Sequence, residues 1–353
     1  MAKPAHLEPS KLGTKEYWDA LYTTEIANHA HDPADTGTAW FDDSDAEAKL
    51  VEFLADPERA RELGLDESTT SFLDLGTGNG ALLFALRDAG WRGPMLGVDY
   101  SAQSVRFARR IERARRGRGR RGGESSSKDE EEGDTHENEE EEAEEAEEGE
   151  GEGEGEGEGE GEGEGEGEGE GEVDVHFVEH DILHGSASPL LDARFFSPSI
   201  VVVDDGWDVV LDKGTFDAIS LSAETLNNNN NNDAATATAT AGGPGRRRRI
   251  NEVYGARVLP LVREGGLFLI TSCNWTEAEL RSWFGDGSSA VQEIPLPAPT
   301  PAPDSISTET ETRERESWGF EVVGRVEYRS FSFGGVKGQT ISSLCFRKVR
   351  KSR

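Results

Sequence analysis

Cysteine is scarce in this 353-residue chain, which has only Cys273 and Cys345. Each lies in an apolar run far from the other, so no disulfide framework is expected and both are predicted to be buried thiols in a reducing compartment. The seven histidines are scattered without ligand spacing, so no metal site is predicted. No catalytic triad of the Ser-His-Asp kind is indicated either.

Long hydrophobic runs are missing as well. No segment approaches the roughly 20 apolar residues of a membrane span, so no membrane partner is expected. His6, Glu8 and Lys11 interrupt the N-terminus, which is unlike a secretory signal. We therefore expect a cytoplasmic protein, with the nucleus as an additional location.

Negative charge is abundant but unevenly placed. The stretch from Glu124 to Glu172 holds 27 of the 71 acidic residues and one lysine, so the rest of the chain carries −8 of the total −34. Such a stretch has no apolar area to offset the entropy of ordering it. We expect a disordered acidic insertion over residues 117–172, with a tail that binds basic proteins as the alternative reading.

Two further segments lack apolar periodicity. Residues 227–247 contain an Asn homopolymer and an Ala-Thr repeat, and residues 286–317 are rich in proline. Without the three insertions about 240 residues remain, an ordinary size for one α/β domain. We therefore expect a single domain over residues 1–353, with an N-terminal lid at 10–60.

Nine arginines occur between Arg106 and Arg121. Val105, Phe107, Ala108 and Ile111 recur at helical spacing among the first of them. We interpret the run as the solvated face of a helix that packs on its apolar side. A nucleic-acid patch or nuclear signal is the alternative.

Strand-like and helix-like segments alternate in the remainder, which predicts a parallel sheet. Thr276 and Glu279 have capping-box spacing at the start of the last helix. The expected strands are 72–75, 95–99, 175–179, 207–212 and 267–271, and the expected helices are 81–88, 101–113, a short one from Phe216, 251–262 and one led by Thr276.

The C-terminal part departs from a dinucleotide-binding domain. Two β-rich runs, 321–328 and 340–347, are separated by a turn around Gly334, Gly335 and Gly338. Adjacent strands without a crossover helix pair antiparallel. A nicotinamide dehydrogenase would instead need a second dinucleotide half, for which the sequence offers no candidate.

The segment LDLGTGNG, Leu73 to Gly80, combines a buried strand, a glycine turn and a helix start, and Asp99 ends the next strand. Glycines there permit close backbone approach to a ligand, and Asp99 can accept both hydroxyls of a ribose. The pattern alone also fits the dinucleotide form G-x-G-x-x-A.

The glycine segment and the antiparallel end together resemble the class I, S-adenosylmethionine-dependent methyltransferase fold. The resemblance implies a Rossmann-like α/β, seven-stranded, mostly parallel sheet in the order 3-2-1-4-5-7-6 with an antiparallel C-terminal hairpin. In that family Asp74 and the glycines face the methionine part of the cofactor, Asp99 the ribose, and Asp181 with Ile182 of HDIL the adenine. For Asp181, capping of a turn is the alternative role.

DKGTFDAISL, Asp212 to Leu221, lacks the Asn/Asp-Pro-Pro-aromatic motif of base and glutamine methyltransferases and resembles the form in seven-strand protein-lysine methyltransferases. Lys213 is read as a surface or carboxylate-pairing lysine rather than a catalytic one. Four further segments resemble signatures of the eukaryotic elongation factor 1-alpha lysine methyltransferases: SKLGTKEYWDALYTTEIANH (10–29), DTGTAWF (35–41), ITSCNWTEAEL (270–280) and FSFGGVKG (331–338).

This resemblance implies a lysine N-methyltransferase that uses S-adenosylmethionine and modifies elongation factor 1-alpha as a monomer without a specific nucleic acid. A small-molecule or nucleic-acid methyltransferase on the same fold, and an acidic chaperone-like binding protein, are the alternatives. It implies catalytic contacts from Asp212, Phe216, Tyr17 and Trp18, and cofactor contacts from Trp40, Asp74, Gly76, Thr77, Gly78, Asn79, Gly80, Asp99, Tyr100, Asp181, Ile182 and Asp212.

Overall fold

The computed structural model describes residues 4–124, 175–191, 206–226, 248–285, 317–333 and 336–351. The predicted insertion at 227–247, residues 125–172 of the acidic insertion, and 286–316 of the Pro-rich insertion lie outside these ranges. The chain divides into two compact units, residues 1–114 with 173–353, and residues 115–172. The described part of the second unit is the last turns of one helix, and the site lies in the first.

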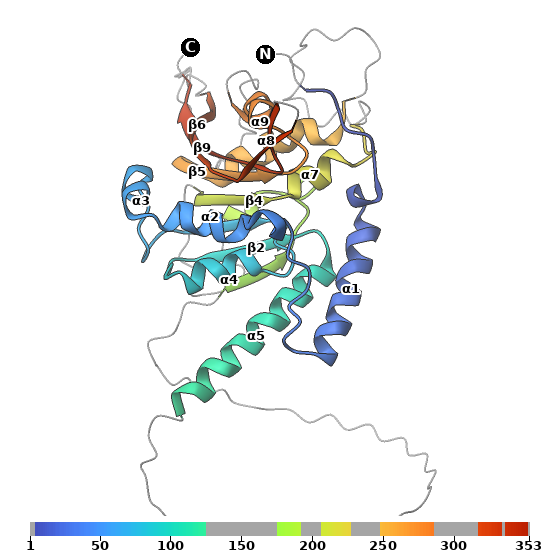
Figure 1. Cartoon of the computed structure of the whole chain (residues 1–353), viewed down its shortest axis with the longest axis vertical. Helices are drawn as coiled ribbons and strands as arrows, with labels where there is room; N and C mark the ends of the chain where they lie inside the picture. The colour runs from blue at the N-terminus through green and yellow to red at the C-terminus, as the bar shows by residue number, and fades with distance from the viewer. Residues whose placement is uncertain are drawn as a thin grey trace, which may run out of the picture. The chain divides into compact units, whose positions relative to one another are not determined.

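Seven strands form one mixed sheet in the order β3-β2-β1-β4-β5-β9-β6, which confirms the expected strand order (Figure 1). β1 pairs parallel with both β2 and β4, whereas β9 pairs antiparallel with β5 and β6. The strands are β1 (Phe72–Leu75), β2 (Met95–Asp99), β3 (Val175–Glu179), β4 (Trp207–Lys213), β5 (Val262–Ser272), β6 (Trp318–Val326) and β9 (Ser342–Arg350).

Helices cover both faces of the sheet because each strand buries side chains alternately on either side. On one face lie α2 (Ala46–Ala55), α3 (Pro57–Leu63), α4 (Ala81–Asp88) and α5 (Ala102–Glu124), while α1 (Lys15–His31) crosses the strand ends and packs Tyr22 with the same cluster. On the other lie α6 (Ser188–Leu191), α7 (Thr215–Ser220), α8 (Tyr254–Val258) and α9 (Glu277–Phe284).

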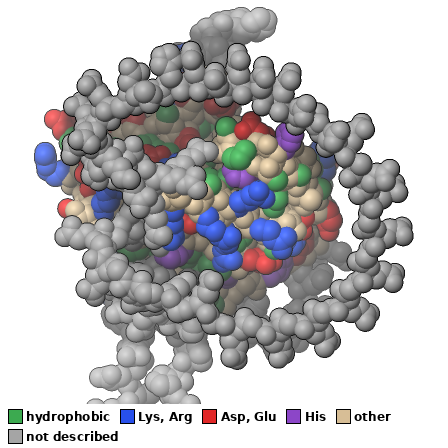
Figure 2. Space-filling model, turned by 90° about the horizontal axis from the view of Figure 1, so that it is seen from below, with side chains coloured by type: hydrophobic (Ala, Val, Ile, Leu, Met, Phe, Trp, Pro, Cys, Tyr) green, Lys and Arg blue, Asp and Glu red, His purple; other side chains and the backbone are tan. Residues whose placement is uncertain are grey.

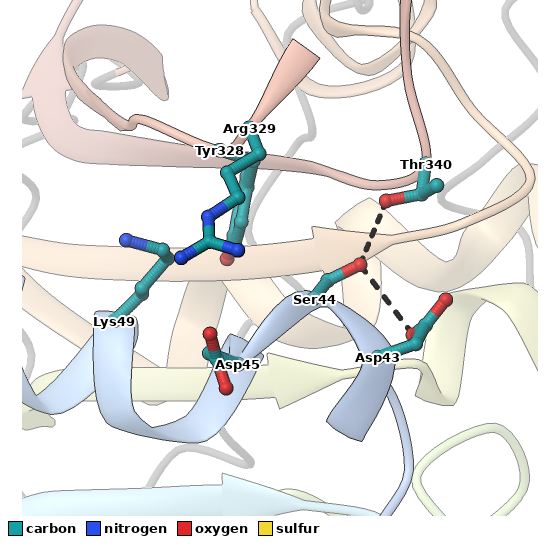
Figure 3. A pocket seen from close by; sticks show the side chains of 7 residues that line it. All are labelled: Asp43, Ser44, Asp45, Lys49, Tyr328, Arg329 and Thr340. Carbon is teal, nitrogen blue, oxygen red and sulfur yellow. Dashed lines mark hydrogen bonds between the residues drawn. The ribbon is translucent and has the colours of Figure 1, made fainter. Parts of the chain in front are cut away.

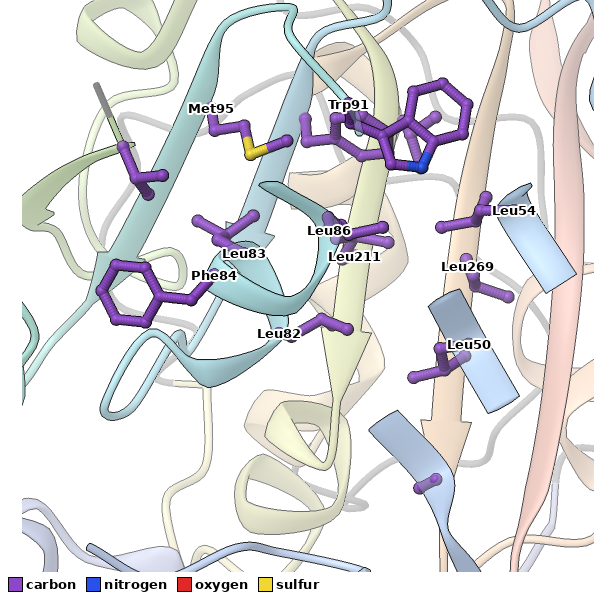
Figure 4. Close-up of a cluster of buried hydrophobic side chains, with 14 of the residues drawn as sticks. Leu50, Leu54, Leu82, Leu83, Phe84, Leu86, Trp91, Met95, Leu211 and Leu269 are labelled. Atoms are coloured by element: carbon purple, nitrogen blue, oxygen red, sulfur yellow. The ribbon is translucent and has the colours of Figure 1, made fainter. Parts of the chain in front are cut away.

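Two hydrophobic clusters hold these layers together. In the first, Leu50 and Leu54 of α2 pack with the leucines of α4 against Leu211 and Leu269 of the sheet (Figure 4). In the second, the ring of Phe268 of β5 meets those of Phe284 of α9, Phe320 of β6 and Phe346 of β9. A fully buried leucine contributes roughly 1.5 to 3 kcal/mol, so these clusters fix where the strand ends lie.

The last helix begins as expected. The Thr276 side chain accepts from the backbone N–H of Glu279, and Glu279 accepts from the N–H of Thr276. The expected antiparallel C-terminal pair is also confirmed, as β6 and β9. Their connection carries a further small hairpin, β7 (Ser330–Phe333) and β8 (Val336–Gln339), where only a turn was expected.

Two expectations were wrong. The continuous helix over 251–262 is instead broken into η4 (Ile250–Val253), α8 and η5 (Leu259–Leu261), and β5 already begins at Val262. Pro260 has no N–H to donate to a preceding turn, which prevents a regular helix there. Cys273 is exposed beyond the end of β5, and only Cys345 is buried.

The arginine-bearing helix α5 packs as predicted, since Val105, Phe107, Ala108 and Ile111 are all buried. Arg109 donates from Nε and Nη2 to the carbonyl oxygen of Phe177 at 2.9 and 2.6 Å. Figure 2 shows lysine and arginine side chains gathered on one face with acidic side chains beside them. None of the helices in the described ranges is long and apolar enough to cross a membrane.

Candidate active site

The carboxyl ends of β1, β4 and β2 bring three of the predicted acidic residues to one edge of the sheet. Leu75, next to Asp74, pairs with Asp212 of β4, and Val98, next to Asp99, pairs with the same Leu75 from the other side. All three carboxylates are at most 6% exposed. Parallel strands of an open α/β sheet place their ligands at this edge.

The glycine loop after β1 is built to approach its neighbours closely. Gly76, Gly78 and Gly80 have φ of 66, 61 and 82°, a region that favours glycine. At Gly76 a Cβ would also clash with the hydroxyl of Thr215, which donates to the carbonyl oxygen of Leu75 at 2.6 Å. Thr215 thus joins the loop to the turn after β4.

The loop is also joined to β2. Asp99 accepts from the backbone N–H of Gly78 at 3.1 Å and of Ser101 at 2.9 Å, while Thr77 donates its N–H to Val98. Burial raises the pKa of Asp99, and these hydrogen bonds oppose the rise. The side-chain amide of Asn79 donates to the carbonyl oxygen of Thr36 in the lid at 2.8 Å.

Asp74 lies in a small charged group beneath the loop. Burial raises the pKa of Asp74 to about 7, against the opposing effects of Thr77 and Lys213. Lys213 has its own pKa lowered by burial, although Glu47 of α2 and Asp74 favour its charged form. The carboxylate-pairing interpretation of Lys213 fits this environment.

Asp212 is 1% exposed and its carboxylate is fully engaged by the chain itself. Oδ1 accepts from the N–H of Thr215 at 2.8 Å, and Oδ2 accepts from the N–H of Phe216 at 3.1 Å and from the hydroxyl of Tyr254 at 2.7 Å. Burial raises the pKa of Asp212 to about 7 despite these bonds. The carboxylate therefore holds the β4–α7 turn.

The ring of Phe216 is fully buried on the side of the sheet away from the lid. It stacks on Tyr254 with centroids 5.5 Å apart and meets Phe284 at 4.9 Å. Only its backbone N–H reaches Asp212. Asp217 accepts from the hydroxyl of Ser272 and from the N–H of Cys273, so it joins α7 to the end of β5.

The N-terminal lid is held at both sides of this edge. The N–H of Ser10 donates to the carbonyl oxygen of Leu221, just after α7, at 3.0 Å. On the other side, Lys15 Nζ donates to the carbonyl oxygen of Tyr100 at 2.5 Å, and the hydroxyl of Ser101 donates to Asp19 at 2.6 Å. Helix α1 thus lies across the strand ends.

Aromatic rings of the lid form one group. Trp18 lies 5.3 Å from both Tyr17 and Trp40, and 6.3 Å from Tyr22, measured between ring centroids. Tyr22 is 5% exposed and its hydroxyl faces Gly78, where a Cβ would approach it to 2.7 Å. The structure therefore brings Tyr17, Trp18 and Trp40 together and adds Tyr22 directly over the glycine loop.

At the far end of the edge, Asp181 and Ile182 follow β3. Asp181 accepts from the N–H of Leu183 at 2.9 Å and contacts His184 Nδ1 at 2.9 Å. Ile182 packs beside the second hydrophobic cluster. Tyr100 is half-buried after β2, and its pKa is raised by burial and by Asp99.

A separate hollow of about 190 Å³ lies between the lid and the C-terminal strands (Figure 3). The Ser44 hydroxyl contacts that of Thr340 at 2.7 Å there. It contains none of the predicted site residues, and its walls mix both charges. Its lining residues are Asp43, Ser44, Asp45, Lys49, Tyr328, Arg329 and Thr340. Within the described ranges, no group of three or more His, Cys, Asp or Glu side chains converges as a metal site.

Sequence reasoning overlooked several residues that organise the site. Lys15 and Asp19 have i,i+4 spacing, and Tyr22 lies one turn beyond Trp18 on the face that also buries Glu25, so helical periodicity could have found them. No comparable signal exists for Tyr254, which reaches Asp212 from 42 residues away.

Comparison with known proteins agrees with this geometry. A family model described as a methyltransferase domain matches residues 66–118. The chain is 30% identical over 350 residues to protein-lysine N-methyltransferase EFM4 of Saccharomyces cerevisiae, covering 99% of both chains. It is 25% identical to EEF1A lysine methyltransferase 2 of Danio rerio, over 98% of this chain and 92% of that protein. The chain therefore belongs to the class I protein-lysine N-methyltransferases of the EFM4 family.

Proposed function

We propose that this enzyme transfers a methyl group from S-adenosylmethionine to a lysine side chain of elongation factor 1-alpha. The observation that carries the proposal is the similarity to EFM4 over 99% of both chains. The relatives of 25% identity are themselves named as lysine methyltransferases of that factor. We further propose that it acts as a monomer in the cytoplasm.

The residues at the sheet edge fit the cofactor of this family, S-adenosylmethionine. Carboxylates at three neighbouring strand ends, Asp74, Asp99 and Asp181, are hydrogen-bond acceptors. They match the amino group, the ribose hydroxyls and the adenine amino group that the cofactor carries in that order. We propose that these residues and the glycine loop hold it. When bound, the cofactor supplies an activated methyl group.

The enzyme must then hold the substrate lysine with its amine neutral and in line with that methyl group. A free lysine with a pKa near 10.4 is neutral about once in two thousand molecules at pH 7, which costs about 4 to 5 kcal/mol. Removing the amine from water lowers its pKa and reduces this cost. We propose that Tyr17, Trp18 and Trp40 exclude water and pack on the aliphatic stem of the lysine, and that cation–π attraction draws in its ammonium group before the proton is lost.

Asp212 has a different role in this proposal. Because its oxygens are occupied by Thr215, Phe216 and Tyr254, we propose that it positions the turn holding Lys213 and Gly214 rather than acting as a base. The geometry of the β4–α7 turn thereby sets where the amine arrives. Phe216 supports this turn from the core.

The test is incubation of the full chain with deuterated S-adenosylmethionine and purified elongation factor 1-alpha, followed by peptide mass spectrometry. We expect labelled methyl groups on a lysine of the factor, and loss of label with Asp99→Ala. A surface variant, Glu67→Ala at an exposed position, should retain labelling. If label appeared only in RNA or in small molecules of a cell extract, the enzyme would instead be a nucleic-acid or small-molecule methyltransferase. Binding of basic proteins without any transfer would favour the acidic chaperone.

A further inference from the structure

The turn after β3 holds the carboxylate of Asp181 on several sides. Oδ1 accepts from the N–H groups of Leu183 and His184 at 2.9 and 3.2 Å, and the N–H of Gly185 donates to the carbonyl oxygen of Asp181 at 2.7 Å. The backbone N–H of His180 donates to the carbonyl oxygen of Asp99, so the turn is tied to the end of β2. Asp181 keeps a partly exposed carboxylate in a fixed position at the strand edge.

The ring of His184 joins this turn to a segment 40 residues away. Nδ1 lies 2.9 Å from Asp181 Oδ2, and Nε2 lies 2.8 Å from Oε1 of Glu224, which follows α7. The Glu224 backbone is itself fixed, because its carbonyl oxygen accepts from the N–H of Ile250 at 3.1 Å. A neutral imidazole has only one N–H, so both ring nitrogens can donate only in the charged form.

The groups facing the ring favour that charged form. Asp181 lies on its own turn and Glu224 across from it, while His180 and Tyr100 face Asp181 from the adjoining strand ends. Partial burial lowers the pKa of His184, but hydrogen bonds and charges from Asp181 and Glu224 outweigh it, so the pKa is raised. Burial opposes ionisation of Asp181, yet the bonds from His184 lower its pKa. The two groups therefore stabilise each other as an ion pair.

We propose that His184 is a positioning residue for cofactor binding, because its ring, bridging Asp181 and Glu224, holds the Asp181 carboxylate oriented toward the adenine end of S-adenosylmethionine. This inference rests on the proposed function, since Asp181 meets adenine only if the chain binds that cofactor. It assigns a role to a residue outside the motifs that carry the family resemblance.

The sign of the pH dependence follows from the direction of the shift. The arrangement is complete below the ordinary histidine pKa of about 6.5 and is lost as the pH rises through the raised value. His184 is 53% exposed, and Asp181 and Glu224 are 39% and 47% exposed, so solvent screens the interaction. We expect a change in cofactor affinity of about two- to fivefold.

The test is calorimetric binding of S-adenosylhomocysteine to the full chain at about pH 6 and pH 8.5. His184→Arg keeps a charge and several donors at both values, so the affinity of the wild type relative to this variant should fall two- to fivefold at the higher pH. The ratio of the two affinities removes the effect of other groups that titrate in both proteins, such as Asp74. In turnover assays His184→Gln should raise KM for the cofactor and leave kcat unchanged.

Two controls separate the possible failures. His31→Gln, at an exposed histidine in the last turn of α1, should follow the wild type at both pH values. Equal pH trends for the wild type and His184→Arg would overturn the role of His184 while leaving the proposed function intact. Absence of binding by the wild type at both pH values would instead overturn the proposed function.

Discussion

Asp74 and Asp212 bury a carboxylate each at the ends of adjacent strands, where removal from water penalises the charged form. Both have pKa values raised to about 7, so both titrate near neutral pH in the ligand-free chain. Their partners differ. Asp212 receives hydrogen bonds from its own turn and Tyr254, whereas Asp74 lies near Lys213. Because their partners differ, Asp212 and Asp74 can be tested separately, Asp212 by turnover and Asp74 by the pH dependence of stability.

Replacement of Asp212 distinguishes a positioning role from a direct one. Asp212→Ala removes the acceptor for the N–H groups of Thr215 and Phe216 and for the hydroxyl of Tyr254, so we expect most of the turnover to be lost while cofactor affinity stays within a few fold. Asp212→Asn keeps one oxygen for the N–H groups of Thr215 and Phe216 and turns its amide N–H to the hydroxyl of Tyr254, which can accept, so it should retain most of the turnover. Steady-state kinetics and calorimetry measure both. Equal loss in the two variants would give the carboxylate a direct part in the reaction.

Asp74 makes the stability of the ligand-free enzyme depend on pH. Because its folded pKa is about 7 and the unfolded value is about 3.9, its stabilising contribution is complete below pH 4 and is lost as the pH rises through 7. Asp74→Asn should lose less stability than the wild type between pH 5 and 8, by on the order of 2 kcal/mol in urea unfolding. Glu58→Gln, at an exposed position, should show the same pH dependence of stability as the wild type. The same pH dependence in Asp74→Asn would contradict the raised pKa of Asp74.

Among the elements, the lid depends on a close approach at its N-terminal end. Gly13 of η1 (Lys11–Gly13) lies so near the backbone of Leu221 and Ser222 that a Cβ would clash with the Leu221 carbonyl group. The adjoining Ser10 donates its N–H to that same carbonyl oxygen. This end of the lid thus lies against the segment that follows α7.

Gly13→Ala should displace this end of the lid without unfolding the sheet, because the contact lies outside both hydrophobic clusters. We expect the affinity for S-adenosylhomocysteine to fall about tenfold, together with faster proteolysis within residues 10–41. Gly117→Ala is a matched control, since nothing lies within 4 Å of a Cβ there. Unchanged binding would show that the lid does not need this contact.

The strands and helices that line the site could be predicted because their signals are local. β1, α4 and β2 have the expected bounds, and the Thr276 cap holds. Local signals failed at residues 250–261, where Pro260 interrupts a helical pattern, and at Cys273, whose apolar neighbours continue on only one side.

Contacts between distant segments had no such signal. The hydroxyl of Tyr254 reaches Asp212, and His184 reaches Glu224, only because the sheet brings their elements together. Phe216 is adjacent to the site in sequence, yet it lies in helix α7, which packs its ring into the second hydrophobic cluster. The resemblance supplied the residues that we predict to meet the cofactor, whereas the partners of those residues required the structure.

At the scale of the whole molecule, most of the net charge of −34 comes from one segment. The stretch from Glu124 to Glu172 contributes −26, and it lies in the unit separate from the one that contains the site. A long connection costs little in loop-closure entropy, roughly 0.6 kcal/mol for each doubling of length. We therefore expect that removing the stretch leaves the folded site unchanged.

Replacement of residues 125–172 by a flexible Gly-Ser linker should leave kcat/KM for elongation factor 1-alpha within twofold at physiological salt. At physiological salt, charge is screened within about 8 Å, so we expect little long-range effect of the acidic stretch on turnover. At low salt, where screening weakens, the same change should slow association with a basic protein substrate. Kinetics at two salt concentrations measure both effects, with a linker of equal length and acidic composition as the control. A large loss of kcat/KM at physiological salt, restored by the acidic linker alone, would make the stretch part of substrate recognition.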